Sequence, residues 1–380
     1  MSPFIQINPP AREWTYKPDD WAEDAILAFH KTLPGYNETR LHSLPDLAAE
    51  LGLGHVLLKD ESDRFGLPAF KILGASWAVY RTVGSHLNLQ VSDGSIPFAD
   101  VGAKARDAGV RVVTITEGNC GRAVARMAAT HMGIPTRVFV PKYMDEATRA
   151  KIRSEGAEVI EVDGTYDDAI PVAMTEAQKR ENTVMVLDVG LEEFNIVPRY
   201  FVQGYSTMLA ESDRQVLALT GRKPATHAIV PVGAGSIGEA VTAHFKSSSR
   251  QEECGLAHVL AVEPATAACL LESLKAGESV MVPTANTIMC GMNCGILSTT
   301  AWPVLKEGID AGVVVTDSES HNAVQELKAR GIFAGPCGAA TLAALRRACA
   351  DAREELSLDK TSVVVIYCTE GQREYLIPSE

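Results

Sequence analysis

The sequence lacks the basic clusters that would direct it to nucleic acids. It contains 35 Lys and Arg against 48 Asp and Glu, a formal net charge of -13, and no block of clustered basic residues occurs. Proteins that bind phosphate backbones need such blocks. The composition therefore argues against a nucleic-acid partner, and it leaves small molecules or copies of the same chain as the expected partners.

Signals for membranes and for secretion are also missing. The first residues, MSPFIQINPPAREW, contain no positive segment followed by an apolar core, as a signal peptide would. No apolar run approaches the roughly 20 residues of a transmembrane helix. The sequence therefore predicts a cytoplasmic protein with no membrane association.

Cysteine and histidine are present without the spacing of structural sites. The eight cysteines, at positions 120, 254, 269, 290, 294, 337, 349 and 368, show no disulfide-framework spacing, and the nine histidines form no HExxH or similar pair. We therefore expect no metal site. Cys269 and Cys294 could still meet near the entrance of a site.

Length and periodicity indicate an α/β protein of two domains. A chain of 380 residues, 46% hydrophobic and 22% charged, is ordinary for a soluble globular protein but too long for one simple core. From about residue 110, short β-branched runs alternate with helical stretches, as in buried parallel sheets. Residues 85–100 break both periodicities, so we expect a smaller domain at 85–189, inserted into a larger one formed by 1–84 and 190–380.

Lys71 occupies an unusual place, between Phe70 and Ile72, in a segment whose other residues are mostly apolar and predicted to be buried. The turn-rich segment before it predicts a loop and SWAVYRTV after it predicts a helix. Lys71 should therefore open a helix, where the local field disfavours a cation and lowers the lysine pKa. A neutral lysine is a nucleophile that can form a Schiff base. A packed stem with a solvated ammonium is the alternative.

Ligands of open α/β sheets bind beyond the carboxyl ends of strands, and the first loop of interest there is VVTITEGNCGRAVA. Its strand ends at Thr116, and Gly118 and Gly121 bracket Asn119 before a helix begins. The free backbone amides of such a turn suit an anion such as a carboxylate. A plain strand-helix turn would explain the glycines but not Glu117, which would repel an anion.

The second loop, in AIVPVGAGSIGEAV, has the spacing G-x-G-x-x-G between a strand and a helix, and Glu263 ends the next strand. This pattern fits the dinucleotide fingerprint, so a nicotinamide-dependent oxidoreductase is one hypothesis. Backbone amides at a helix N-terminus would hold the phosphate of any cofactor equally well. The predicted phosphate-binding residues are Gly233, Ala234, Gly235, Ser236, Ile237 and Gly238.

The third loop follows the last apolar run, in SVVVIYCTEGQREYL, and offers Cys368 or Thr369 as a small polar group. A surface turn is an equal alternative for this loop alone. Together, the features match what pyridoxal phosphate needs: Lys71 for a covalent bond, a phosphate cup, Asn119 for the ring oxygen, and Thr369 or Cys368 for the ring nitrogen.

These segments resemble the fold-type II pyridoxal phosphate enzymes, the tryptophan synthase β-like group, and within it the diaminopropionate ammonia-lyases. The resemblance covers nearly the whole chain and rests on KDESDRFGLPAFKILGAS, TEGNCGRAVA, PRYFVQGYSTM, TIMCGMNCG, GPCGAATL and CTEG. It implies two open, twisted, mostly parallel sheets flanked by helices, with Lys71 as the cofactor lysine, residues 233–238 as the phosphate loop and Asn119 at the ring oxygen. It also implies a homodimer that converts 2,3-diaminopropionate to pyruvate and ammonia.

The sequence departs from that family on the presumed substrate side. Glu117 stands where the family has aspartate, and Cys120 stands where it has histidine. After the retained Asp188, Leu191 replaces an aromatic residue and Glu193 replaces a glycine. The predicted substrate-binding residues are Glu117, Gly118, Asn119, Cys120 and Asp188.

The implied reaction is α,β-elimination to a 2-oxo acid, with Lys71, Glu117 and Asp188 as the catalytic residues. Lys71 would take the α-proton of an L substrate. The two acids would pair with a β-ammonium or serve a D substrate, unless Glu117 is an exposed loop charge and Asp188 a helix cap. A serine or threonine dehydratase, a β-replacement enzyme, an NAD(P)-dependent oxidoreductase and a non-catalytic binding protein are the alternatives.

Overall fold

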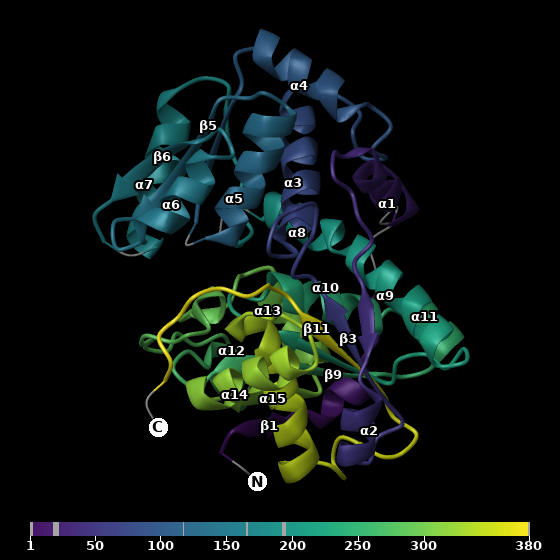
Figure 1. The fold of residues 1–380 in the computed structure, drawn as a ribbon. Helices are drawn as coiled ribbons and strands as arrows, with labels where there is room; N and C mark the ends of the chain where they lie inside the picture. The colour runs from purple at the N-terminus through teal and green to yellow at the C-terminus, as the bar shows by residue number, and fades with distance from the viewer. Residues whose placement is uncertain (1–2, 18–22, 117, 165, 192–194, 379–380) are drawn as a thin grey trace.

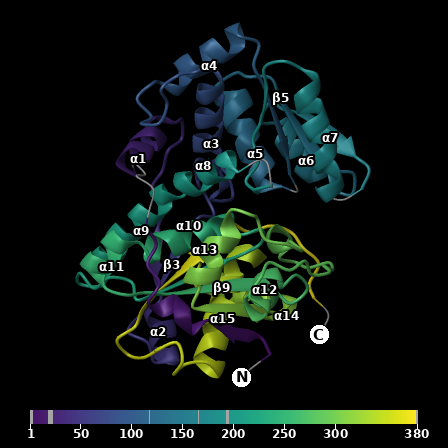
Figure 2. The same ribbon diagram turned by 180° about the vertical axis from the view of Figure 1, so that it is seen from behind.

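The computed structural model describes residues 3–17, 23–116, 118–164, 166–191 and 195–378. Its backbone forms two lobes, and each lobe contains one sheet covered by helices on both faces (Figure 1). The view from behind shows the same two lobes, with both chain ends on the larger one (Figure 2). The predicted α/β class with two mostly parallel sheets is confirmed.

The larger sheet has seven strands in the order β1-β10-β9-β8-β11-β3-β2. The five central strands run parallel, and the two edge strands are antiparallel to their neighbours. Along β11, alternate side chains enter different hydrophobic clusters on the two faces, which explains the continuous apolar run VVVIYC. The strands are β1 (Ile5–Ile7), β2 (Leu41–Ser43), β3 (His55–Asp60), β8 (His227–Pro231), β9 (His258–Pro264), β10 (Ala311–Val315) and β11 (Val363–Cys368).

The smaller sheet has four parallel strands in the order β6-β5-β4-β7. Apolar side chains of its central strands pack against α7 on one face and against α5 and α6 on the other. The strands are β4 (Arg111–Ile115), β5 (Thr136–Pro141), β6 (Glu158–Val162) and β7 (Thr183–Met185).

Helices connect the strands and cover both sheets. In the part of the chain that the structure describes, no helix is long and apolar enough to cross a membrane. The α-helices are α1 (Glu23–Thr32), α2 (Pro45–Leu51), α3 (Lys71–His86), α4 (Phe98–Asp107), α5 (Asn119–Ala125), α6 (Glu146–Arg153), α7 (Tyr166–Lys179), α8 (Ile196–Gly204), α9 (Ser206–Leu219), α10 (Ser236–Phe245), α11 (Ser248–Cys254), α12 (Cys269–Ala276), α13 (Ala301–Gly308), α14 (Asp317–Ala329) and α15 (Pro336–Asp351). Short helical segments occur at η1 (Pro9–Arg12), η2 (Arg126–His131) and η3 (Cys290–Met292).

The crossing of α3 and α8 fixes the start of α3. At this crossing a side chain on Gly204 would place its Cβ 2.4 Å from Leu73 O, and one on Gly74 would lie 2.6 Å from a ring carbon of Tyr205. Only glycine permits such a close approach of the two helices. The crossing therefore holds Lys71, at the first turn of α3, against the end of α8.

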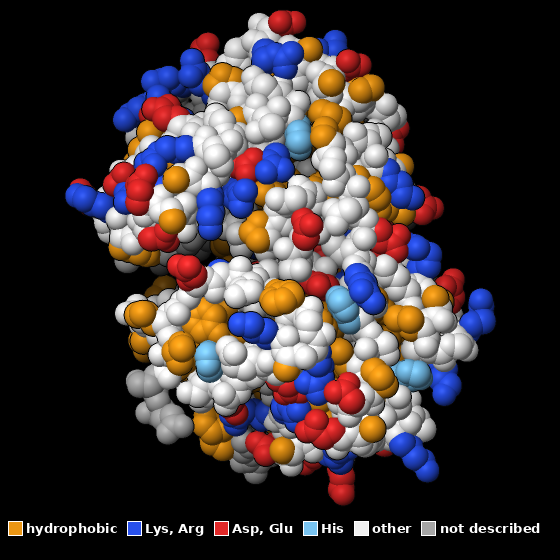
Figure 3. Space-filling model, viewed as in Figure 1, with side chains coloured by type: hydrophobic (Ala, Val, Ile, Leu, Met, Phe, Trp, Pro, Cys, Tyr) orange, Lys and Arg blue, Asp and Glu red, His pale blue; other side chains and the backbone are white. Residues whose placement is uncertain are grey.

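All strands of the smaller sheet fall within residues 85–189, and all strands of the larger sheet fall outside that range. However, α3 and α8 pack against each other, and α3 also packs against α5 of the smaller lobe. The exact domain bounds stay a prediction. The space-filling view shows the surface hollowed between the two lobes (Figure 3), and the candidate site lies where the lobes meet.

Candidate active site

The three loops predicted from the sequence lie at the carboxyl ends of β4, β8 and β11, where open sheets bind ligands. Interactions link the first and the third of these loops to the start of α3. Phe70 N donates to Thr369 O at 3.4 Å, and Lys71 lies within electrostatic range of Cys120. Segments far apart in the sequence therefore meet around Lys71.

Lys71 is the first residue of α3, as predicted. Its Nζ donates to Asp188 Oδ2 at 2.6 Å, and the two side chains are only 22% and 13% exposed. Burial works to lower the pKa of Lys71, but the Asp188 carboxylate outweighs burial and raises that pKa well above its usual range. The predicted depression of the Lys71 pKa is therefore wrong, because a carboxylate distant in sequence compensates the local effects.

Asp188 is a buried acid whose charge is maintained by its neighbours. Burial works to raise the pKa of Asp188, yet the Lys71 ammonium and a hydrogen bond from the Cys120 thiol hold the pKa below its usual value. The alternative of a helix cap is wrong, because the next helix, α8, begins only at Ile196. Asp188 is thus an anion directed at the amine of Lys71.

The first loop differs from the prediction in its backbone amides. Gly118 N and Gly121 N both donate to Thr116 Oγ1 at 2.9 Å, so these two amides are not among the free backbone N–H groups that the turn was predicted to offer. The Thr116 hydroxyl stabilises the turn into α5 in the place of an anion. The first-turn amides of Asn119 and Cys120 are left as candidate anion donors.

Some predicted residues of the substrate side cannot be placed. Glu117 and Glu193 lie outside the described residues. Leu191 is partly buried and packs against the hydrophobic cluster of the smaller lobe. The predicted roles of Glu117 therefore stay predictions, whereas Cys120 and Asp188 can be described in full.

The glycine loop approaches its neighbours closely. Gly235 has φ +109°, and a Cβ there would lie 2.7 Å from the Cβ of Ala301. A Cβ on Gly233 would lie 3.1 Å from Gly291 O. The helix α10 begins directly after Gly235, at Ser236. The loop thus presents backbone at a helix N-terminus, an arrangement that suits a phosphate.

Glu263 does not act as the acid of a dinucleotide site. Its two carboxylate oxygens accept from Leu270 N at 2.7 Å and from Leu271 N at 2.8 Å, and the residue is fully buried. Glu263 therefore stabilises the N-terminus of α12. Because the carboxylate is fully buried beneath these amides, it is not exposed to a ribose, and the nicotinamide hypothesis loses its acidic residue.

The third loop is buried, so the surface-turn alternative is wrong. Cys368 is fully buried and Thr369 is 4% exposed. The Cys368 thiol donates to Glu370 O at 3.5 Å, which leaves Thr369 as the candidate polar group. Since Thr369 O accepts the amide hydrogen of Phe70, the candidate lies beside the cofactor lysine predicted from the sequence.

Tyr205 is a site residue that the sequence analysis did not identify. It is fully buried between α8 and α9, and its hydroxyl lies within electrostatic range of Lys71. Burial raises the pKa of this phenol, so it stays protonated. The segment PRYFVQGYSTM contributed to the family resemblance. An aromatic residue in such an apolar segment is normally interpreted as part of the hydrophobic core, so nothing in the sequence assigned Tyr205 to the site.

The two cysteines expected near a site entrance border the glycine loop. Cys294 Sγ would lie 3.2 Å from a Cβ on Gly233, and Cys269 Sγ lies 3.9 Å from Gly233 O. Neither cysteine forms a disulfide bond within the described residues.

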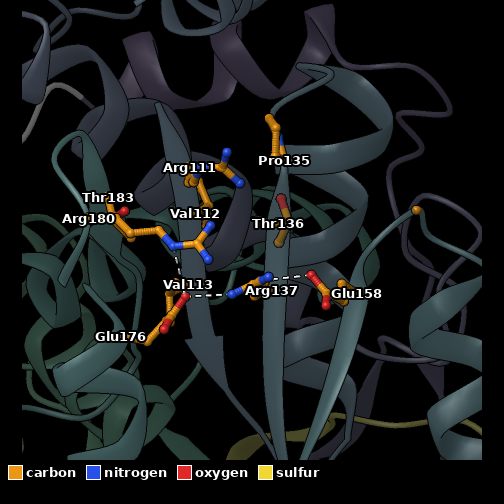
Figure 4. A pocket seen from close by; sticks show the side chains of 11 residues that line it. Arg111, Val112, Val113, Pro135, Thr136, Arg137, Glu158, Glu176, Arg180 and Thr183 are labelled. Atoms are coloured by element: carbon orange, nitrogen blue, oxygen red, sulfur yellow. Dashed lines mark hydrogen bonds and ion pairs between the residues drawn. The ribbon is translucent and has the colours of Figure 1, made fainter. Parts of the chain in front are cut away.

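A separate pocket lies at the opposite, amino-terminal ends of the strands of the smaller sheet (Figure 4). Arg137 pairs there with Glu158 at 2.7 Å and with Glu176 at 2.5 Å. These pairs neutralise much of the charge in the pocket, and open sheets bind ligands at the other strand ends. This pocket is therefore a poor candidate for the active site.

Comparison with known proteins agrees with this geometry. The sequence pattern described as pyridoxal-phosphate dependent enzyme matches residues 32–369. The chain belongs to this family. Diaminopropionate ammonia-lyase from Salmonella typhimurium is 34% identical over 300 residues, which cover 77% of this chain and 72% of the relative. The Escherichia coli K12 protein of the same name is 31% identical over 356 residues, covering 90% and 86%.

Solved structures place this pyridoxal-phosphate dependent enzyme in the same group. Diaminopropionate ammonia-lyase from Escherichia coli, in complex with an aminoacrylate-PLP azomethine reaction intermediate, is 28% identical with a TM-score of 0.84, covering 97% of this chain and 93% of that one. Maize serine racemase has a TM-score of 0.71 at 22% identity, covering 92% and 93%, which shows the fold alone. The resemblance to the diaminopropionate ammonia-lyases is confirmed.

The cofactor of this pyridoxal-phosphate dependent enzyme is pyridoxal phosphate, and the residues present fit it. The glycine loop presents backbone at the N-terminus of α10, and it packs so closely on α13 that a Cβ at Gly235 would collide with Ala301. An amine at Lys71 and a small hydroxyl at Thr369 lie on segments that touch. The predicted roles of these residues, as a phosphate cup, an amine for covalent attachment and a small polar group, stay predictions that this geometry is compatible with.

Replacing Gly235 with alanine should weaken retention of pyridoxal phosphate by roughly tenfold, because the new methyl group would collide with Ala301 and displace the phosphate loop. Gly277→Ala is the matched control, since Gly277 also has positive φ but has open space around it. Cofactor content after dialysis, read from visible absorbance, measures the effect. If the two variants lost equal amounts of cofactor, the cause of the loss would be backbone strain and not the collision with Ala301.

Proposed function

We propose that this enzyme is an ammonia-lyase that converts 2,3-diaminopropionate to pyruvate and ammonia. The observation that carries the proposal is the anionic Asp188 at 2.6 Å from the Lys71 amine, in a chain 34% identical to a diaminopropionate ammonia-lyase. A substrate with a β-ammonium needs such an acid. Neither serine nor threonine carries a second cation that would use it.

Lys71 has two proposed tasks. Its amine attaches pyridoxal phosphate, which when bound supplies the electron sink for removal of the α-proton. When it is free of the cofactor, Lys71 Nζ would take that proton from an L substrate, since it lies at the opening of α3 beside the loops that would hold the substrate. Asn119 and the phosphate loop at 233–238 keep the predicted roles of orienting the ring and the phosphate.

Asp188 is proposed to bind the β-ammonium of the substrate. A cation that enters a closed site loses hydration and must recover that free energy by pairing. When the Lys71 nitrogen is engaged by the cofactor, Asp188 loses the strongest cationic partner that it has in this structure. A β-ammonium can replace this partner. Glu117 remains the predicted second acid.

The test is release of 2-oxo acid and ammonia from L- and D-2,3-diaminopropionate, compared with serine and threonine. We expect pyruvate from diaminopropionate, with a lower kcat/KM for the hydroxy amino acids. Asp188→Asn should lower turnover of diaminopropionate by about a hundredfold while the visible absorbance of the bound cofactor persists. Asp163→Asn, at an acid that is 87% exposed, is the control. Release from serine or threonine alone would favour a dehydratase.

We also propose that the protein forms a homodimer, as the family resemblance implies. Its mass in solution, measured by light scattering, tests this directly. A monomer that retains full activity would remove the proposal. The cytoplasmic location stays a prediction from the sequence.

A further inference from the structure

The segment 297–300 lies between the phosphate loop and the chain that follows Asp188. Ser298 N donates to Ala234 O, in the phosphate loop, at 2.8 Å. Ser298 Oγ accepts from Gly190 N, two residues after Asp188, also at 2.8 Å. Ser298 is 1% exposed, so it forms both hydrogen bonds in the protein interior. One residue therefore connects the predicted phosphate site with the segment that carries the acid of the site.

Gly190 packs closely against the same segment. A Cβ on Gly190 would lie 2.8 Å from Thr299 Oγ1 and 2.9 Å from Thr300 Cγ2, so only glycine lets the backbone approach this near. Thr299 Oγ1 also donates to Asn195 Oδ1, directly before α8, at 3.0 Å. The chain is thus held against this segment at Gly190 and again at Asn195.

The residues around Ser298 also pack on the phosphate loop. A Cβ on Gly235 would lie 2.7 Å from the Cβ of Ala301 and 3.7 Å from Leu297 Cδ2. Ala301 begins α13, which packs beside α10 on the part of the larger lobe that faces the smaller one (Figure 1). Because close-packed interiors transmit displacements, a shift of the phosphate loop would move Ser298 with it.

We propose that Ser298 is a positioning residue that holds the Asp188 carboxylate in a set place relative to the bound cofactor. Its hydroxyl fixes the backbone two residues after Asp188, and its amide ties the same residue to the phosphate loop. The inference rests on the proposed function, because it takes Asp188 as the acid that binds the β-ammonium of the substrate. Misplacing such a group by about 1 Å can lower the rate by about a hundredfold.

Ser298→Ala should lower kcat/KM for 2,3-diaminopropionate by roughly tenfold, because it leaves the buried Gly190 N–H without its acceptor. The visible absorbance of the bound cofactor should persist. Ser362→Ala is the matched control. Ser362 is 2% exposed and its Oγ accepts from Asp359 N at 2.9 Å, but it precedes the amino-terminal end of β11, away from the site. Equal effects of the two variants on kcat/KM would overturn the inference.

A double-mutant cycle tests whether Ser298 acts through Asp188. In an Asp188→Asn background, Ser298→Ala should change kcat/KM by less than about twofold, since the carboxylate that Ser298 positions is already gone. A further tenfold loss would show that the two residues act independently, and it would overturn the proposed role. Gly190→Ala, whose Cβ would collide with Thr299, should lower kcat/KM as Ser298→Ala does, and it serves in the same cycle if Ser298→Ala does not fold.

Hydrogen exchange needs no turnover. In the holoenzyme, the Gly190 amide should exchange at least about tenfold faster in Ser298→Ala than in the wild type, because its hydrogen bond is lost. Mass spectrometry of a peptide that spans residue 190 measures the rate. Unchanged exchange would show that Ser298 does not hold this segment. If the wild type released no pyruvate from diaminopropionate, the proposed function would fail, but the exchange rate would still decide whether Ser298 anchors Gly190.

Discussion

Replacing Lys71 with alanine is expected to lower turnover by about a thousandfold or more, because the chain loses both its point of covalent attachment and its base for the α-proton. Pyridoxal phosphate would then be held only by its phosphate and ring contacts. Borohydride reduction of the wild type, followed by digestion and mass spectrometry, should recover the cofactor on the peptide that contains Lys71. In the Lys71→Ala variant no peptide should carry it.

Lys142→Ala is the control, because Lys142 is 67% exposed and pairs with the exposed Asp163. This variant should keep full turnover and the label on Lys71. Recovery of the reduced cofactor on another lysine of the wild type would contradict the assignment of Lys71. So would a colourless wild-type protein that binds NAD.

Replacing Glu211 with glutamine is expected to lower the free energy of unfolding by about 3–5 kcal/mol, because it leaves a buried cation uncompensated. Glu211 Oε2 lies 3.0 Å from Lys59 Nζ and 2.7 Å from Arg64 Nη2, and Arg64 also pairs with Glu61 at 2.6 Å. All of these side chains have zero exposure. The network ties β3 and the segment before Lys71 to α9.

Glu38→Gln is the matched control for this network. Glu38 pairs with Arg214 at 2.7 Å, but the two side chains are 35% and 61% exposed, so its loss should cost less than about 1 kcal/mol. Urea unfolding measures both variants. If both variants lost the same free energy of unfolding, burial would not determine how much an ion pair contributes to stability.

The effect of Glu211→Gln should depend on pH. Burial works to raise the pKa of Glu211, but Arg64 and Lys59 lower it below the ordinary value. A carboxyl group with a depressed pKa in the folded state stabilises that state above its unfolded pKa, and the contribution disappears as pH falls through the folded pKa. The difference between wild type and variant should therefore be full at pH 7 and shrink below about pH 4. Urea unfolding at a series of pH values tests the trend.

Local sequence determined the fold class and the places where chemistry could occur. Alternating apolar runs and helical stretches gave the α/β class, because burial on both faces of a parallel sheet leaves a continuous hydrophobic run. The turn-rich segment before SWAVYRTV placed Lys71 at the start of α3, and the glycines at 233, 235 and 238 predicted a loop at the N-terminus of a helix. Each of these features depends on neighbours within a few residues.

Contacts between distant segments decided the electrostatics of the site. Lys71 and Asp188 are 117 residues apart in sequence, and only the meeting of the two lobes brings the carboxylate to the amine and reverses the predicted pKa shift. By its position in the sequence, Glu263 matched the acid of a dinucleotide site. In the folded chain its carboxylate instead accepts hydrogen bonds from backbone amides at the N-terminus of α12. Partners of a charge are set by three-dimensional proximity, and in a buried site of low dielectric these partners outweigh the local field that the sequence predicts.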